Sequence, residues 1–139
     1  MTVINGTSAG EFLPGADGDD TLTAGQGDDN VQGGAGNDTY VFTRGDGADY
    51  YYDDSGANTI VFTDVKSTEL VGIDGLAYGS LRLKYSATDS IVLQLASGYY
   101  GTAYQPVSYQ FSDSITLTHE ELLNKFTISF HNFFIFYIF

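Results

Sequence analysis

Apolar residues recur every nine positions in the first part of the chain, separated by glycine-rich polar stretches. Each apolar residue has one residue on either side of it that need not be apolar. This three-residue stretch predicts a very short strand with one side chain turned inward, because strand side chains alternate with period two. A unit with a single buried side chain has no core of its own, so the units must stack. In this register the units are 6–14, 15–23, 24–32, 33–41, 44–52 and 53–61.

Two further columns share this register. The fourth place is glycine in five of the six units, and the sixth place carries a side-chain oxygen in all six. Glycine permits a positive φ and a tight turn, which puts the sixth-place oxygen at the end of that turn. The fourth-place glycines are Gly18, Gly27, Gly36, Gly47 and Gly56, the sixth-place residues are Glu11, Asp20, Asp29, Asp38, Asp49 and Asn58, and the eighth-place residues are Leu13, Leu22, Val31, Tyr40, Tyr51 and Ile60.

The period is interrupted once, by Phe42 and Thr43. Two added residues preserve the alternation of a strand, whereas one would reverse it. We therefore expect an extended strand with Phe42 on the same face as Tyr40.

The second half of the chain has the pattern of antiparallel strands over residues 79–118, with a turn at Ser86–Ser90. Thr118 followed by Glu121 predicts a capping box for a short helix, HEELLNK, with His119 exposed at its start. The alternating apolar residues are Leu81, Leu83 and Tyr85, then Ile91, Leu93 and Leu95, then Val107, Tyr109 and Phe111, and finally Ile115 and Leu117.

Charge narrows the class of protein. The 139 residues include 18 acidic and 5 basic ones, a net charge of −13, which argues against binding to nucleic acid or to an anionic membrane surface. Residues 6–62 hold 11 of the acids and one base, Arg44. Because the carboxylates repel one another, this segment remains disordered unless a cation neutralises it. With no cysteine, disulfides and thiolate metal sites are excluded.

The spacing of the turns points to calcium. Parallel strands repeat at roughly 4.7–4.9 Å, and two oxygens on opposite sides of a calcium ion are about 4.6–5.2 Å apart. Magnesium, with bonds of about 2.0–2.1 Å, would draw the turns too close together. Zinc would favour His or Cys, and the repeats contain neither.

The units GADGDDTLT, AGQGDDNVQ and GGAGNDTYV resemble the RTX (haemolysin-type) calcium-binding nonapeptide repeat, and GNDTYVF followed by RGDGAD resembles the end of such an array. In that family two nonapeptides form one coil of a β-roll, and calcium lies between turns two repeats apart. The resemblance implies that Asp20 faces Asp38 across an ion and that Asp29 faces Asp49. Asp38 would serve a second ion with Asn58. Two or three ions are expected, with further ligands from carbonyls in the loops around Gly18, Gly27, Gly36 and Gly47, including those of Gly33 and Ala35.

Several acids and one unit depart from this scheme. The first unit lacks the fourth-place glycine, has Glu11 in place of Asp and is expected to be a terminal cap. Asn58 keeps an oxygen without a charge, which should weaken the last site. The remaining repeat acids are expected to be solvated loop carboxylates rather than ligands: Asp17, Asp19, Asp28, Asp46, Asp53 and Asp54.

The expected fold is all-β: a parallel β-roll over residues 1–62, followed over 63–139 by an antiparallel capping region with one short C-terminal helix. The resemblance implies a non-catalytic, secreted, extracellular protein that folds when it binds calcium and leaves the cell through a type I secretion apparatus. Stable membrane insertion is not expected. One alternative is the export and folding module of a larger secreted hydrolase, toxin or adhesin.

Two segments stay open. The Tyr-rich stretch 97–105 suits a glycan partner through aromatic stacking, although a loop packed on the sheet is the simpler interpretation. The tail 126–139 has six Phe and no charge, and it is too short for a membrane span. It fits equally an export signal, a final strand covering the sheet, or a translated frame error or truncation junction. No Ser/His/Asp set, phosphate loop or paired-carboxylate cleft stands out. His119-Glu120 lacks the second His of a zinc protease motif.

Overall fold

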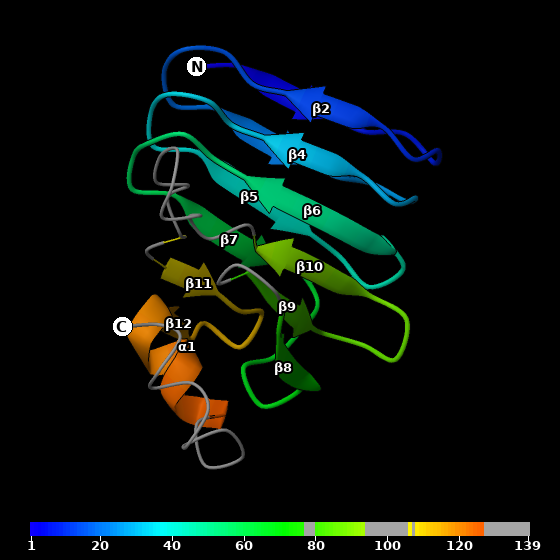
Figure 1. Ribbon diagram of the computed structural model, residues 1–139, viewed down its shortest axis with the longest axis vertical. Helices are drawn as coiled ribbons and strands as arrows, with labels where there is room; N and C mark the ends of the chain where they lie inside the picture. Colours follow the sequence, from blue (N-terminus) through cyan, green and yellow to red (C-terminus); the bar gives the residue numbers. More distant parts are fainter. Residues whose placement is uncertain (77–79, 94–105, 107, 127–139) are drawn as a thin grey trace.

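Successive nine-residue units place their strands alternately in two facing sheets, as the computed structural model shows for residues 1–76, 80–93, 106 and 108–126 (Figure 1). One sheet has the order β1 (Val3–Asn5), β3 (Thr21–Thr23), β5 (Thr39–Phe42), β7 (Thr59–Phe62), β11 (Ser108–Gln110) and β12 (Thr116–Thr118). The other has the order β2 (Phe12–Pro14), β4 (Asn30–Gln32), β6 (Ala48–Tyr52), β10 (Ser90–Leu93), β9 (Leu81–Lys84) and β8 (Gly72–Gly75). The helix α1 (His119–Phe126) follows β12.

Strands two units apart pair in parallel, which confirms the predicted β-roll. Leu22 aligns with Tyr40 in one sheet, and Leu13 aligns with Val31 in the other. Each pair is 18 residues apart, so two nonapeptides make one coil. The stack also begins one strand earlier than the six units suggest, because β1 pairs with β3 and places Ile4 beside Leu22.

The core is the column of eighth-place side chains between the sheets. Every one of the six is buried, from Leu13 at 7% exposure to Tyr40, Tyr51 and Ile60 at 0%. The ring centroids of Tyr40 and Tyr51 lie 4.6 Å apart in an edge-to-face arrangement, a geometry that favours aromatic pairs beyond their burial. The predicted inward alternation is therefore correct along the whole array.

The inserted pair lengthens the coil from 18 to 20 residues without reversing the strand faces. Phe42 is buried with Tyr40 in β5 and aligns with Phe62 in β7, as expected. The wider coil is filled by aromatic rings: Phe62 lies 5.2 Å from Tyr85 and 5.3 Å from Phe111, centroid to centroid. The core thus changes from aliphatic to aromatic along the stack.

The second half continues both sheets. The predicted hairpin over 81–93 forms, with Leu83 opposite Ile91, and β11 pairs with β12 through Tyr109 opposite Leu117. The pairs within this half are antiparallel, as expected, but the junction with the roll is parallel: β10 pairs in parallel with β6 and β11 in parallel with β7. The open ends of the two roll sheets thereby gain hydrogen-bonding partners.

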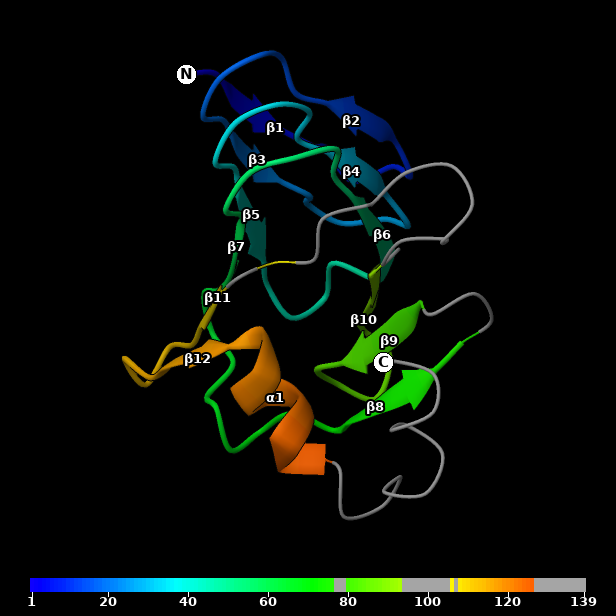
Figure 2. The same cartoon turned by 60° about the vertical axis from the view of Figure 1, so that its left-hand side comes forward.

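Helix α1 carries the expected capping box. Thr118 Oγ1 accepts a hydrogen bond from Glu121 N at 3.1 Å, and Glu121 Oε2 accepts one from Thr118 N at 2.8 Å. The amphipathic helix packs Leu122 into the core, close to β11 and β12 in both views (Figure 1 and Figure 2).

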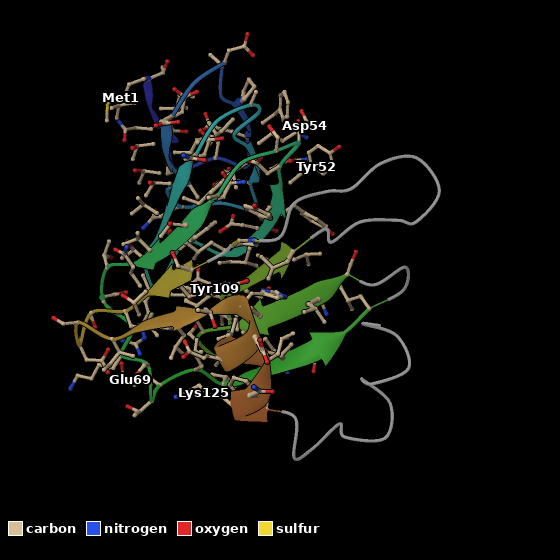
Figure 3. The ribbon with its side chains drawn as sticks, turned by 90° about the vertical axis from the view of Figure 1, so that its left-hand side faces the viewer. Met1, Tyr52, Asp54, Glu69, Tyr109 and Lys125 are labelled. Carbon is tan, nitrogen blue, oxygen red and sulfur yellow. The ribbon has the colours of Figure 1, made fainter. Side chains whose placement is uncertain are left out.

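His119 is a correction. It was expected to be exposed, but it is buried, with Nδ1 2.8 Å from the Tyr109 hydroxyl and the two rings stacked. Figure 3 shows Tyr109 beside the helix. Burial lowers the pKa of His119 to about 4. The first residue of this helix is therefore part of the core.

Four expectations lie outside the described residues: the strand positions Leu95 and Val107, the Tyr-rich stretch 97–105 and the tail from 127 onward. The division of the chain at residue 62 stays a prediction, as does the role of the second half as a cap.

Gly36 shows why the fourth place needs glycine. Its φ is +129°, and a Cβ at this position would lie 2.5 Å from the Gly18 carbonyl oxygen one coil away. Gly45 also has a positive φ, +95°, but a Cβ there would meet nothing within 4 Å. Gly36 is therefore held by both backbone conformation and the close approach of the neighbouring coil, whereas Gly45 is held by backbone conformation alone.

We expect Gly36→Ala to destabilise the folded protein by about 2 kcal/mol or more, because strain and steric overlap add. Gly45→Ala should cost about 1 kcal/mol from strain alone. Chemical denaturation of both variants in saturating calcium measures the difference. Equal losses would show that contact between coils does not select glycine.

We expect His119 to titrate near pH 4 instead of near 6.5. A lowered folded pKa means that His119 favours the fold above pH 6.5 and that this contribution is lost as the pH falls toward 4. The pH dependence of the His119 ring signals in NMR measures the pKa, and His119→Asn identifies those signals. A pKa at or above 6.5 would contradict the buried position.

Candidate metal centre

The sixth-place side chains line two opposite edges of the roll. The turns 15–20, 33–38 and 53–58, which lead into β3, β5 and β7, form what we call the Asp38 edge. The turns 6–11, 24–29 and 44–49, which lead into β2, β4 and β6, form the Asp29 edge. The two edges are the left and right sides of the stack in Figure 1, where the β9–β10 turn continues the Asp29 edge.

On each edge a carboxylate reaches back to the main chain of the preceding turn. Asp38 Oδ1 accepts a hydrogen bond from Asp20 N at 2.8 Å, and Asp49 Oδ1 accepts one from Asp29 N at 2.9 Å. Asn58 Oδ1 accepts one from Asp38 N at 2.8 Å. The structure therefore brings together the three pairs expected to share ions: Asp20 with Asp38, Asp29 with Asp49, and Asp38 with Asn58.

The second oxygen of these carboxylates is the unusual feature. Asp29, Asp38 and Asp49 are each 1% exposed. Their Oδ2 atoms are buried and have no hydrogen-bonding partner. An ionised carboxylate taken out of water without a partner is costly, so these oxygens fit a bound cation. Because they are hard oxygen donors and the repeats contain no His or Cys, the cation class they suit is calcium.

The glycine loop 33–36 approaches the Asp38 carboxylate closely. A Cβ on Gly33 would collide with Asp38 Oδ2 and with the Tyr40 hydroxyl, so only glycine allows this approach. The Ala35 carbonyl accepts a hydrogen bond from Gly18 N at 2.7 Å, which joins two turns of the Asp38 edge. Direct ligation by these loop carbonyls, and by those near Gly27, Gly36 and Gly47, stays a prediction.

Residues 14–46 match the family model of the RTX calcium-binding nonapeptide repeat, in four copies. This segment is an RTX repeat array. A search of curated proteins gave no match for the chain. Among the described residues, no helix is long and apolar enough to span a membrane, and no three acidic or histidine side chains cluster closely enough to hold a metal.

Burial within the RTX array changes the acidity of its carboxyl groups. Desolvation raises the pKa of Asp49 to about 7, with smaller contributions from the charges of Asp29 and Asp46. Desolvation likewise raises the pKa of Asp38 to about 6, and the nearby Asp53 adds to the shift. Asp20, near the end of the stack, has a lowered pKa because the Ala16 N–H binds its carboxylate. Without calcium, Asp38 and Asp49 therefore keep their protons to a higher pH than an exposed aspartate does.

The acids outside the sixth column divide into two groups. Asp17, Asp19, Asp28 and Asp54 are exposed, as expected. Asp46 and Asp53 were expected to be solvated, and this was wrong: Asp46 is 6% exposed and Asp53 is 0% exposed. Asp46 Oδ2 accepts from Thr43 N at 2.7 Å, and Asp53 Oδ1 accepts from Ser55 N at 2.9 Å. Both carboxyl groups fold back onto their own turns instead of pointing to solvent.

Two contributors to the edges were not anticipated. Asp89, in the β9–β10 turn, accepts hydrogen bonds from Gly45 N and Gly47 N, both at 3.0 Å, and so covers the last turn of the Asp29 edge. The Tyr40 hydroxyl reaches out of the core, accepts from Gly33 N at 2.6 Å and donates to Asp53. The only sequence signal for Asp89 is its place in a polar turn before a strand. The only signal for Tyr40 is its hydroxyl, which Tyr51 alone shares among the eighth-place residues.

We expect the calcium-free array to lose stability as the pH rises. A folded pKa of about 7 against 3.8 means that Asp49 favours the fold below pH 4 and that this contribution is lost as the pH passes 7. In a chelator, acidification from pH 8 to 5 should increase β structure in the wild type. The same acidification should raise the free energy of unfolding, and Asp49→Asn should reduce that increase by on the order of 1 kcal/mol. Denaturant unfolding followed by circular dichroism measures both. An identical pH response in the variant would exclude Asp49 as its source.

Proposed function

We propose that the array is a calcium-triggered folding module of a secreted, non-catalytic protein. The observation that carries this proposal is the set of buried Oδ2 atoms of Asp29, Asp38 and Asp49, each without a hydrogen-bonding partner. Calcium binding itself is the property of the repeat family that the array matches. The folding switch, the site of action and the route of export are parts of the proposal.

In this proposal calcium binds between turns two units apart. Asp20, Asp38 and Asn58 would hold it on the Asp38 edge, and Asp29 and Asp49 on the Asp29 edge, with carbonyls of the glycine loops beside them. The bound ion supplies positive charge to oxygens that the fold has removed from water. Because the unfolded chain has no preformed site, the free energy of binding becomes free energy of folding.

The charge distribution supports a switch. Eleven acids against one base in residues 6–62 repel one another when no cation is present. At low calcium the chain would remain extended, which suits passage through a type I secretion channel, and extracellular calcium would then drive folding. RTX repeat proteins are typically secreted, which agrees with this sequence of events.

The test is a calcium titration of the chelated protein, followed by circular dichroism and calorimetry. We expect a cooperative gain of β structure. Asp38→Asn should weaken the apparent calcium affinity about tenfold or more, because Asp38 contacts the turns on both sides of it. Asp29→Asn should weaken the sites of the other edge.

Asp17→Asn is the matched control, since it makes the same change in charge at an exposed residue outside the sixth column. Its apparent affinity should stay within about twofold of the wild type. Identical spectra in chelator and in calcium, with no heat of binding, would refute the folding switch.

A further inference from the structure

The last turn of the Asp38 edge is built differently from the others. Asp53 occupies the first place of its unit, where Gly15 and Gly33 stand in the two preceding turns of this edge. Its carboxyl group is 0% exposed, and it receives hydrogen bonds from the Tyr40 hydroxyl and from Ser55 N. A buried acid therefore replaces a residue that has no side chain.

This acid lies beside the free oxygen of the neighbouring turn. A Cβ on Gly33 would collide both with Asp38 Oδ2 and with the Tyr40 hydroxyl that donates to Asp53, so the two carboxyl groups lie beside the same point of the loop. Asp38 Oδ2 is buried without a hydrogen-bonding partner. Two carboxyl groups from adjacent turns thus meet in one desolvated place. Like charges so close repel strongly unless a cation or a proton lies with them.

The sixth place of the same unit explains the need for a second acid. Asn58 accepts the hydrogen bond from Asp38 N but adds no charge. The Asp20 and Asp38 turns together offer two sixth-place carboxylates, whereas the Asp38 and Asn58 turns offer one. Calcium affinity depends on the number of charged ligands, so Asn58 alone would leave this pair of turns weak.

We propose that Asp53 is a ligand of a divalent cation, bound together with Asp38 between turns 33–38 and 53–58, and that it replaces the charge missing at Asn58. This inference rests on the proposed calcium-binding function and extends it to a turn beyond the matched residues 14–46. The last turn then supplies one carboxylate ligand, as the preceding turns do, but from the first place of its unit instead of the sixth.

Two tyrosines make this site observable. Tyr40 donates to Asp53, and the Tyr51 hydroxyl accepts from Asn58 Nδ2 at 3.2 Å. The chain has no tryptophan, so excitation near 280 nm reaches a bound terbium ion through tyrosine. Terbium, a trivalent mimic of calcium, should therefore emit strongly from this site.

The experiment compares Asp53→Asn with Asp54→Asn in the full chain, by calcium calorimetry and by tyrosine-sensitised terbium emission. Asp54 is the adjacent, exposed acid, and it lies with Tyr52 at the margin of the same edge (Figure 3). Asp53→Asn should lose one calcium ion or bind it at least tenfold more weakly, and its terbium emission should fall by more than half. Asp54→Asn should match the wild type in both measurements.

Restoring the charge at the sixth place separates ligation from a structural role. We expect Asp53→Asn combined with Asn58→Asp to recover the lost ion and the β structure, which also decides the case if Asp53→Asn alone fails to fold. A merely structural Asp53 would not be rescued in this way. Unchanged ion number, affinity and emission in Asp53→Asn would overturn the inference, as would failure of the double variant to restore the ion. A wild-type chain that binds no calcium would instead refute the proposed function.

Discussion

The rest of the structure depends on one interaction, the hydrogen bond that a backbone N–H of one turn donates to the sixth-place side-chain oxygen of the next turn. It uses one carboxylate oxygen to fix the spacing of adjacent coils, and it leaves the other oxygen buried at the same edge. An asparagine can make this hydrogen bond, as Asn58 does, but it cannot carry the charge. Spacing and charge are therefore separate properties of one column, and Asp supplies both.

This arrangement ties stability to the solution around the protein. The aliphatic and aromatic column between the sheets favours the roll under all conditions, since its burial does not depend on ions. The acidic edges oppose the roll until protons or cations reach Asp38 and Asp49. In the second half Asp89 takes up two backbone N–H groups of the last turn of the Asp29 edge. The N–H groups of that turn therefore already bind a carboxylate of the protein, while Asp49 in the same turn keeps an Oδ2 without a hydrogen-bonding partner.

The predictability of each feature depended on whether it was periodic. The nine-residue spacing was enough to predict the stacked strands and the inward column ending at Ile60, because a stacked coil repeats the same contact at each turn. The pairing of carboxylates two units apart followed from the resemblance to the RTX repeat. Asp53, Asp89 and His119 were not anticipated correctly, since each owes its burial to a partner far away in the sequence or in an unrelated element. Local pattern shows that a carboxylate is in a turn, but it does not show whether that turn faces water.

The two residues inserted at Phe42 and Thr43 also affect how the chain finds its native alignment. Coils of near-identical sequence can pair one coil out of step at little cost in energy, which makes slipped alignments a kinetic trap for repetitive chains. A 20-residue coil filled by Phe42, Phe62 and Tyr85 does not match an 18-residue coil filled by Leu22 and Val31. The insertion therefore breaks the translational symmetry of the array at one end, and the coil that contains it fixes the register of the remaining coils.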